Sequence, residues 1–218
     1  RGTGAMRIEI DRVRPRFLAD PVVERSEIWG RSHVLAPGCR WVVHGPSGRG
    51  KSTFLRILFG LERRFSGTLS IDGEPVSGEP FRLWPRLRFR SIAFVPQEFL
   101  LFGDSDGWAN LARLPRHAEN VDADRIAAWA DRLGILPLMA RPTDTWSLGQ
   151  RQRLAILRAL AAPFSFLLLD EPFSNLDPDS AESALGLVEE VSAEREAGWI
   201  LTAQTGRQRP HARDYLAV

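Results

Sequence analysis

Eight consecutive residues of this chain have the composition of a phosphate-binding loop. The pattern G-x-x-x-x-G-K-[ST] is matched by Gly45, Pro46, Ser47, Gly48, Arg49, Gly50, Lys51 and Ser52, with Thr53 next. Glycines let successive backbone N–H groups turn inward around a polyphosphate, because no side chain blocks its approach. Lys51, the only lysine of the chain, would reach the terminal phosphates, and the Ser52 hydroxyl would reach a magnesium ion. The pattern therefore predicts a nucleotide phosphate site.

Two adjacent carboxylates follow a continuous apolar run later in the chain. Residues 166–169 read Phe-Leu-Leu-Leu, and Asp170 and Glu171 follow directly. A carboxylate at a strand end beside a phosphate loop suits magnesium binding by Ser52 and Asp170, while Glu171 is placed to accept a proton from an attacking water. Side chains alternate along an extended strand, so we expect Asp170 and Glu171 to point in different directions.

Three further polar positions fall where ligand-facing residues collect. Gln97 follows a predicted strand at 91–95, and Gln204 follows another at 199–203. Ser147 and Gly149 precede an apolar helical pattern, which is either a second anion-binding helix start or a plain serine N-cap.

The predicted elements place the phosphate loop between a strand and a helix. Residues 39–44 are predicted to form a short buried strand, and residues 53–59 a helix that ends at Gly60. Further strands are predicted near residues 8–13, 67–73 and 215–218, and a helix at 178–197. Residues 99–158 lack a strand pattern and carry helical spacing at 121–133, which predicts a helical subdomain inserted into a sheet domain.

Composition limits the classes of function. The 218 residues suffice for one α/β domain, and 29 basic against 27 acidic residues give a net charge of +2, which argues against nucleic acid as the main partner. The arginine-rich residues 81–90 fit a solvated helix face better than an RNA or membrane surface site. Cys39 is the single cysteine, so no internal disulfide forms, and we expect a reducing compartment. The longest mainly apolar run, residues 159–169, is too short to cross a bilayer.

With these motifs in order, the chain resembles the ATP-binding subunit of ABC transporters along nearly its whole length. The resemblance implies an α/β fold: a P-loop NTPase (RecA-like) core with an N-terminal antiparallel β subdomain and an inserted α-helical subdomain. It divides the single domain, 1–218, into a core with β subdomain at 1–98 and 159–218 and a helical subdomain at 99–158. The cofactors implied are ATP and Mg²⁺.

The resemblance also implies roles for individual residues. Phe17, which on its own is as compatible with a core position, is similar to the aromatic that stacks on adenine. Gln97 is similar to a glutamine that touches magnesium and the attacking water, Asp170 to the magnesium carboxylate, and Glu171 to the catalytic base. Across a dimer interface, the resemblance assigns contacts to Ser147, Gly149, Gln150 and Asp177.

Two positions depart from the family pattern. Leu148 replaces a glycine of the Leu-Ser-Gly-Gly-Gln signature, which is acceptable if this position needs no left-handed backbone. Gln204 stands where the family has a histidine after the last core strand. Losing one preorganised donor to the transferred phosphoryl group costs ~10² to 10³ in rate, so we expect slow hydrolysis with Gln204 as the substitute donor.

The implied protein is a cytoplasmic ATPase on the inner face of the membrane. It would pair as a homodimer, or with a second ABC subunit, and drive a separate transmembrane permease; residues 97–110 mildly resemble subunits of lipoprotein-release exporters. The missing histidine leaves a second function open, a regulatory module in which ATP-dependent dimerisation is the switch and hydrolysis is weak. An ABC-type protein of DNA repair or translation fits poorly, because those need a long coiled coil or two cassettes.

Overall fold

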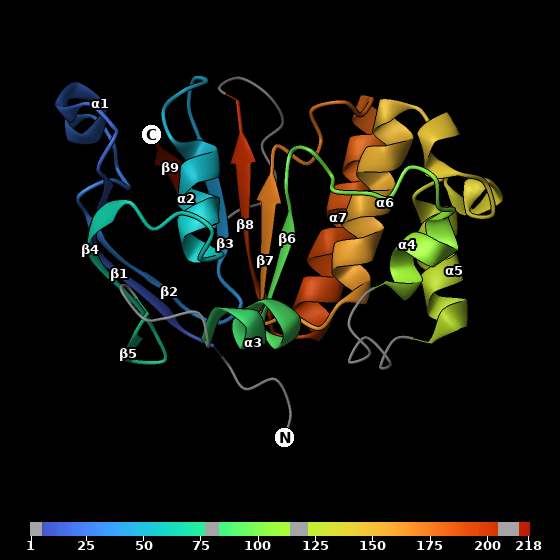
Figure 1. Cartoon of the computed structure of the whole chain (residues 1–218), viewed down its shortest axis with the longest axis horizontal. Helices are drawn as coiled ribbons and strands as arrows, with labels where there is room; N and C mark the ends of the chain where they lie inside the picture. Colours follow the sequence, from blue (N-terminus) through green and yellow to red (C-terminus); the bar gives the residue numbers. More distant parts are fainter. Residues whose placement is uncertain (1–5, 77–82, 114–121, 205–213) are drawn as a thin grey trace.

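A computed structural model describes residues 6–76, 83–113, 122–204 and 214–218. Two β-sheets and a group of helices follow one another along the longest axis of the molecule (Figure 1). The antiparallel sheet has the strand order β2-β1-β4-β5, and the second sheet has the order β6-β7-β8-β3-β9. All four pairings within this second sheet are parallel. This arrangement confirms the predicted fold class.

The antiparallel sheet comes from an alternating sequence at the N-terminus. Its strands are β1 (Ile8–Pro15), β2 (Ser32–Leu35), β4 (Phe65–Ile71) and β5 (Glu74–Pro75). Ile8, Ile10 and Val13 are buried on one face of β1, as their spacing predicts, with an irregularity in the pairing to β4 after Asp11. The short helix α1 (Asp20–Glu24) lies between β1 and β2.

The parallel sheet is buried on both faces. Its strands are β3 (Arg40–His44), β6 (Ile92–Val95), β7 (Phe166–Asp170), β8 (Gly198–Ala203) and β9 (Asp214–Ala217). Successive residues of β7 join two different clusters: Phe166 and Leu168 pack with α2 (Lys51–Leu58), whereas Leu167 and Leu169 pack with α6 (Leu148–Ala161) and α7 (Pro178–Glu194). A strand covered on both sides reads as a continuous apolar run, which explains the sequence of β7.

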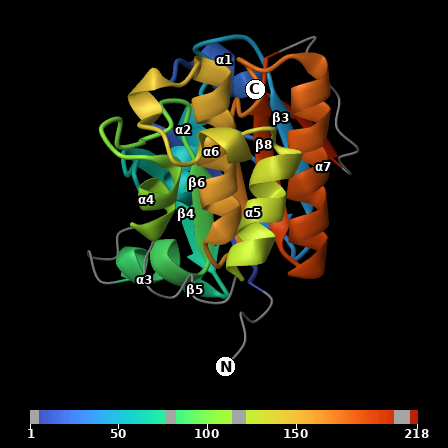
Figure 2. The same cartoon turned by 90° about the vertical axis from the view of Figure 1, so that its right-hand side faces the viewer.

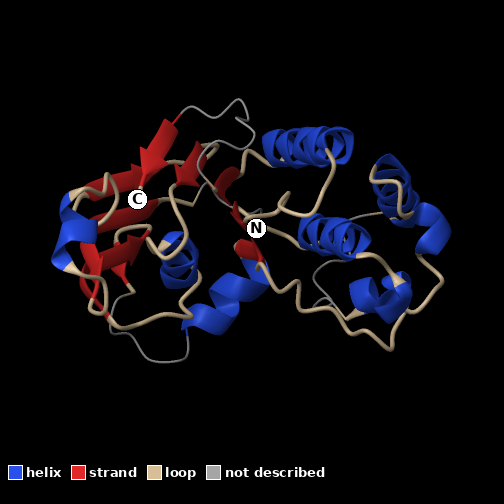
Figure 3. Ribbon diagram, turned by 90° about the horizontal axis from the view of Figure 1, so that it is seen from above, coloured by secondary structure: helices blue, strands red, loops and turns tan. Residues whose placement is uncertain are grey.

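Residues 99–158 hold the helical part of the chain. It contains α4 (Gly107–Ala112), α5 (Ala123–Arg132), the 3₁₀ turns η2 (Leu136–Leu138) and η3 (Thr143–Thr145), and most of α6. Among its described residues the only β pairing is an isolated bridge between Asp106 and Pro142. Figure 2 shows α5, α6 and α7 side by side, and Figure 3 shows α4 and α5 at the end of the molecule away from the antiparallel sheet. The division between positions 158 and 159 falls inside α6, and the exact subdomain limits stay a prediction.

Helix α3 (Leu83–Arg90) has a buried side rather than a wholly solvated one. Trp84 and Leu87 belong to the core, and the Arg88 guanidinium donates hydrogen bonds to the carbonyls of Phe59 and Gly60 at the end of α2. Phe81 lies outside the described residues. No helix in the described part of the chain has the length and apolar character needed to cross a membrane.

Candidate active site

The phosphate loop joins the end of β3 to the start of α2, as its sequence predicts. Gly48 and Gly50 adopt left-handed backbones, with φ of +80° and +93°. Non-glycine residues rarely take this conformation, which accounts for the glycine that the pattern requires at position 50 and for the additional glycine at position 48. The Lys51 side chain is buried, and its Nζ donates to the carbonyl oxygens of Gly45 at 2.9 Å and Pro46 at 3.2 Å. The loop thus curls around its own lysine at the N-terminus of a helix, where anions bind favourably.

Neighbouring segments fix the shape of this loop. A Cβ atom on Gly45 would stand 2.6 Å from the backbone oxygen of Val218, so the residue that follows strand β9 excludes a side chain there. A Cβ atom on Gly50 would stand 3.0 Å from the ring of Trp29. The buried Trp29 also donates its indole N–H to the carbonyl of Arg49. The loop is therefore held by contacts that leave no room for substitution at Gly45.

Ser52 and Asp170 meet at the carboxyl end of the parallel sheet. The Ser52 hydroxyl donates to Asp170 Oδ1 at 3.0 Å, and the Thr202 hydroxyl donates to the same oxygen at 2.8 Å. Asp170 is 4% exposed, and this burial raises the pKa of its carboxyl above the usual range, although the hydrogen bonds from Thr202 and Ser52 act in the opposite direction. The site thus presents a hydroxyl and a carboxylate oxygen together, as predicted from the two motifs.

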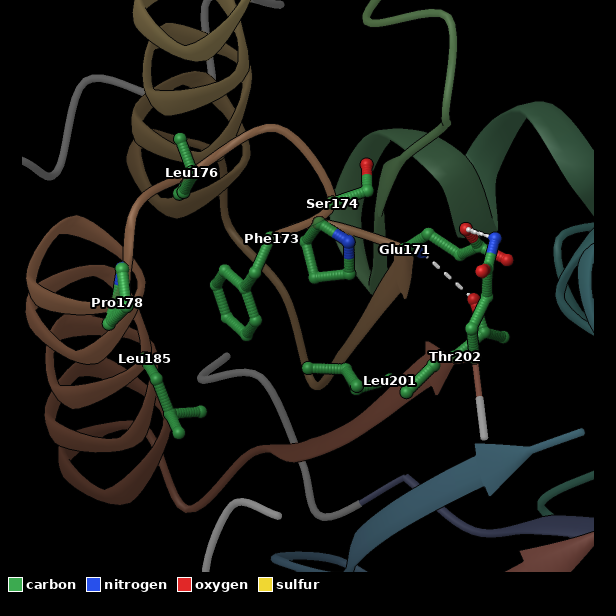
Figure 4. A pocket seen from close by; sticks show the side chains of 11 residues that line it. Glu171, Phe173, Ser174, Leu176, Pro178, Leu185, Leu201 and Thr202 are labelled. Carbon is green, nitrogen blue, oxygen red and sulfur yellow. Dashed lines mark hydrogen bonds between the residues drawn. The ribbon is translucent and has the colours of Figure 1, made fainter. Parts of the chain in front are cut away.

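Glu171 also turns toward α2, which differs from the alternation expected along the strand. Strand β7 ends at Asp170, and Glu171 adopts a left-handed backbone with φ of +47°. Its Oε1 lies 3.4 Å from Lys51 Nζ, and its Oε2 accepts a hydrogen bond from Gln204 Nε2 at 3.1 Å. Figure 4 shows the Glu171 side chain on the Thr202 side, away from the apolar Phe173, Leu185 and Leu201. The alternation stops at Asp170 because the next residue is no longer extended.

The second predicted anion-binding position is a complete capping box at the start of α6. The Ser147 side chain accepts from the Gln150 backbone N–H, and the Gln150 side chain accepts from the Ser147 N–H. Leu148 lies in the first turn with no left-handed backbone and is 47% exposed. A Cβ atom on Gly149 would stand 2.8 Å from the carbonyl oxygen of Asn175. The glycine at position 149 therefore permits close packing, whereas position 148 tolerates leucine.

A comparison with protein-family models matches residues 31–174 to the family described as ABC transporter. The match covers more than half of the chain and includes the phosphate loop, the α6 start and both carboxylates. This chain belongs to the ABC transporter family.

The relatives of this ABC transporter chain are named for the transport of different substances. It is 33% identical, over 97% of its length, to the Fe(3+) ions import ATP-binding protein FbpC 2 of Rhodococcus jostii (strain RHA1). It is also 33% identical, over 82% of its length, to the lipoprotein-releasing system ATP-binding protein LolD of Hahella chejuensis (strain KCTC 2396). The chain spans 59% of the first relative and 78% of the second.

The same fold occurs in a solved ABC transporter. The structure of a bacterial Atm1-family ABC exporter with ATP bound matches 99% of this chain and 37% of the exporter chain, with a TM-score of 0.78 and 25% identity. The chain therefore corresponds to one part of that larger molecule.

Three residues assigned by the ABC resemblance lie outside the cluster around Lys51. Gln97 is exposed after β6, and none of the hydrogen bonds described joins it to Ser52 or Asp170. Phe17 is 51% exposed, with the Arg64 guanidinium 5.3 Å from its ring centre. Asp177 is the N-cap of α7 and accepts from the Ser180 N–H, which holds the pKa of Asp177 below its usual range. Their roles toward a nucleotide or a second chain stay predictions.

Sequence reasoning missed two residues of this ABC site. Thr202 contacts both Asp170 and the Glu171 backbone N–H. The signal that could have revealed it is a polar residue within the otherwise apolar run 199–203. Trp29 supports the phosphate loop from a segment without regular structure, so no periodicity in the sequence marks it.

Proposed function

We propose that this chain binds and hydrolyses ATP and thereby powers transport through a separate membrane subunit. One observation carries the proposal: the phosphate loop and the two carboxylates at the end of β7 converge, with Ser52 on Asp170 and Lys51 beside Glu171. A phosphate loop whose serine lies beside a strand-end aspartate is the arrangement with which P-loop enzymes hold the nucleotide phosphates and Mg²⁺. The names of the relatives as ATP-binding proteins of import and release systems support the transport assignment.

The loop fits a polyphosphate. The left-handed glycines at 48 and 50 present backbone N–H groups without side chains, and α2 directs its N-terminus at the same place. We assign ATP contacts to Lys51, Ser52 and the following Thr53, together with the loop residues from Gly45 to Gly50. Phe17 would stack on the adenine, with Arg64 already covering part of its ring.

The donor set also fits Mg²⁺. A serine hydroxyl and an aspartate carboxylate are hard oxygen ligands of the kind that magnesium prefers, and Gln97 would add an amide oxygen. When bound, Mg²⁺ neutralises charge on the phosphate oxygens. Ser52 and Asp170 would hold it, and Thr202 orients the Asp170 carboxylate through its hydroxyl.

Glu171 is the residue that we propose as the general base. Its carboxylate would take a proton from the attacking water, a contribution of ~10² to 10⁴ to the rate. Gln204 lies within hydrogen-bond distance of that carboxylate and is neutral, so it donates a weaker hydrogen bond than a charged imidazole would. We therefore propose slow hydrolysis, with Gln204 as the substitute for the family histidine.

A second copy completes the proposed site. Helices α2 and α6 pack on opposite faces of the parallel sheet, so the Ser147 helix start of one chain is separated from its own Lys51 by β7 and β8. Ser147 and Leu148 are exposed and free to contact a partner, as is Asp177. We propose a head-to-tail dimer in which Ser147, Gly149 and Gln150 of one protomer contact ATP held by the other, at the cytoplasmic face of a membrane permease.

The Glu171→Gln variant tests this function. It should bind ATP with unchanged affinity, lose most of its turnover and accumulate as a dimer in size-exclusion chromatography with ATP. Normal hydrolysis by the variant would show that Glu171 is not the base. The regulatory alternative, motivated by Gln204, predicts that wild-type turnover gains little when the membrane subunit is added.

A further inference from the structure

Gln152 is a buried amide that links α6 to the proposed base. It is 1% exposed and lies two residues beyond the capping box. Its Nε2 donates to the Glu171 carbonyl at 3.1 Å and lies 3.4 Å from Ser174 Oγ, while its Oε1 accepts from the Asn175 N–H at 3.1 Å. Both ends of the amide are therefore committed to the segment that follows β7.

The Glu171 backbone is held from two sides. Its N–H donates to Thr202 Oγ1 at 2.9 Å from β8, and its carbonyl accepts from Gln152 on α6 at 3.1 Å and from the Ser174 N–H at 3.2 Å. A left-handed backbone is unfavourable at a non-glycine residue such as Glu171 and persists only where neighbours enforce it. That conformation turns the Glu171 carboxylate to within 3.4 Å of Lys51. Gln152 and Thr202 are thus the two side chains from other elements that hold the Glu171 backbone in this conformation.

We propose that Gln152 is a positioning residue that ties the placement of the Glu171 carboxylate to the placement of the α6 N-terminus. The inference rests on the proposed function, in which that N-terminus faces ATP held by the partner protomer. Gly149, which lies on α6 together with Gln152, packs against the Asn175 carbonyl. A shift of α6 therefore moves Gln152 and the 174–175 backbone together. Docking of α6 onto the partner's nucleotide would then set the base in place.

A purely structural role predicts a different result from a positioning role. If Gln152 only stabilised the fold, its replacement would lower the melting temperature and leave the kinetics of the folded fraction unchanged. A positioning role lowers kcat, with little change in the KM for ATP, because the phosphate loop is untouched.

The Gln152→Glu variant tests this difference in the full chain. The carboxylate keeps the length of the side chain and the acceptor for Asn175, but it loses the donor to Glu171 and places an oxygen against that carbonyl. We expect kcat to fall roughly 10- to 100-fold with the ATP dissociation constant unchanged within about 3-fold. If Gln152→Glu does not fold, Gln152→Met, which keeps length and removes both hydrogen bonds, is measured in its place.

The control is Asn110→Asp in α4. Asn110 is also a 1% exposed amide, and it donates to the carbonyls of Phe102 and Asp106 in the helical part, away from Glu171. This variant places a carboxylate in an equally buried amide position, so it should lower stability and leave kcat near the wild-type value. An equal loss of kcat in Asn110→Asp would overturn the inference.

The decisive measurement repeats Gln152→Glu in the Glu171→Gln background. If Gln152 acts through Glu171, the double variant keeps the residual rate of Glu171→Gln, because the two losses are not additive. A further loss of the same factor would overturn the inference and leave the proposed function intact. Wild-type turnover by Glu171→Gln alone would instead overturn the assignment of the base, and the inference with it.

Discussion

Glu171 combines a strained backbone with a carboxylate that is already paired. Its φ of +47° is uncommon for a residue with a side chain, and its two oxygens lie beside Lys51 and Gln204. Left-handed residues of this kind occur where the surrounding structure over-determines them, which often is at functional sites. Lys51 contacts the proposed base in this arrangement, so a phosphate that draws Lys51 away leaves the Glu171 carboxylate with Gln204 as its remaining donor.

Gln204 allows a direct test at the scale of one residue. Gln204→His restores an imidazole that, when charged, donates a stronger hydrogen bond, so we expect kcat to rise about 10-fold or more. Gln204→Ala removes the donor to Glu171 Oε2 and should lower kcat by a similar factor. ATP turnover of the three proteins is compared at saturating ATP, with the ATP dissociation constant as the internal control. Ordinary wild-type rates together with an inert Gln204→Ala would rule out this role.

At the scale of elements, the contact between α6 and the 174–176 segment depends on Gly149. A Cβ atom there would meet the backbone oxygen of Asn175 at 2.8 Å, which cannot move cheaply. In α7, a Cβ atom on Gly186 would meet only the end of the Arg132 side chain at 2.9 Å, which can rotate away. Alanine gains up to about 1 kcal/mol over glycine in a helix interior. Gly186→Ala should therefore stabilise the chain by about that amount, whereas Gly149→Ala should destabilise it.

Urea unfolding of the two glycine variants checks this pair. They are matched in chemistry and both lie in helices, so opposite signs of the change in unfolding free energy isolate the clash with Asn175. Equal stabilisation by both would show that α6 can move away from the 174–176 segment without cost. The Gly149→Ala variant should also lose ATP turnover, because α6 carries both Ser147 and Gln152.

The turn from α2 to β4 gives the chain a pH dependence in the acid range. Hydrogen bonds from Arg64 lower the pKa of Glu62 from 4.5 to about 2; the Arg64 side chain has the largest effect and the Arg64 backbone N–H the next largest. A lowered carboxyl pKa contributes stability above the unfolded value of 4.5, and this contribution is lost as the pH falls toward 2. The melting temperature of Glu62→Gln should thus lie below that of wild type at pH 7, and the two should converge below pH 4.5. Parallel curves down to pH 2.5 would contradict the assigned shift.

The elements of this chain follow closely from its sequence, because their signals are local. The phosphate loop, the apolar run of β7 and the serine before α6 each specify their structure within a few residues. What the sequence does not encode locally is the turn of Glu171 after β7, since it depends on Thr202 from β8 and Gln152 from α6. The support of the loop by Trp29 likewise joins segments that are distant in the chain. Local sequence patterns therefore do not predict hydrogen bonds between residues that are far apart in the chain.

At the scale of the whole molecule, the sheet between α2 and α6 makes one chain insufficient for the proposed site. Two variants separate the halves: Lys51→Ala removes the phosphate-loop ammonium, and Ser147→Arg blocks the helix start of α6 with a bulky cation. Each alone should be nearly inactive, because every site in its dimer lacks one half. Mixing the two forms dimers in which one site has Lys51 from one protomer and Ser147 from the other. Random pairing then predicts at most about a quarter of wild-type turnover in an equal mixture.

Two outcomes would contradict this arrangement of the site. A mixture no more active than its components would mean that the phosphate loop and the α6 start do not act on the same nucleotide. Activity in Ser147→Arg alone would place the whole site within a single chain.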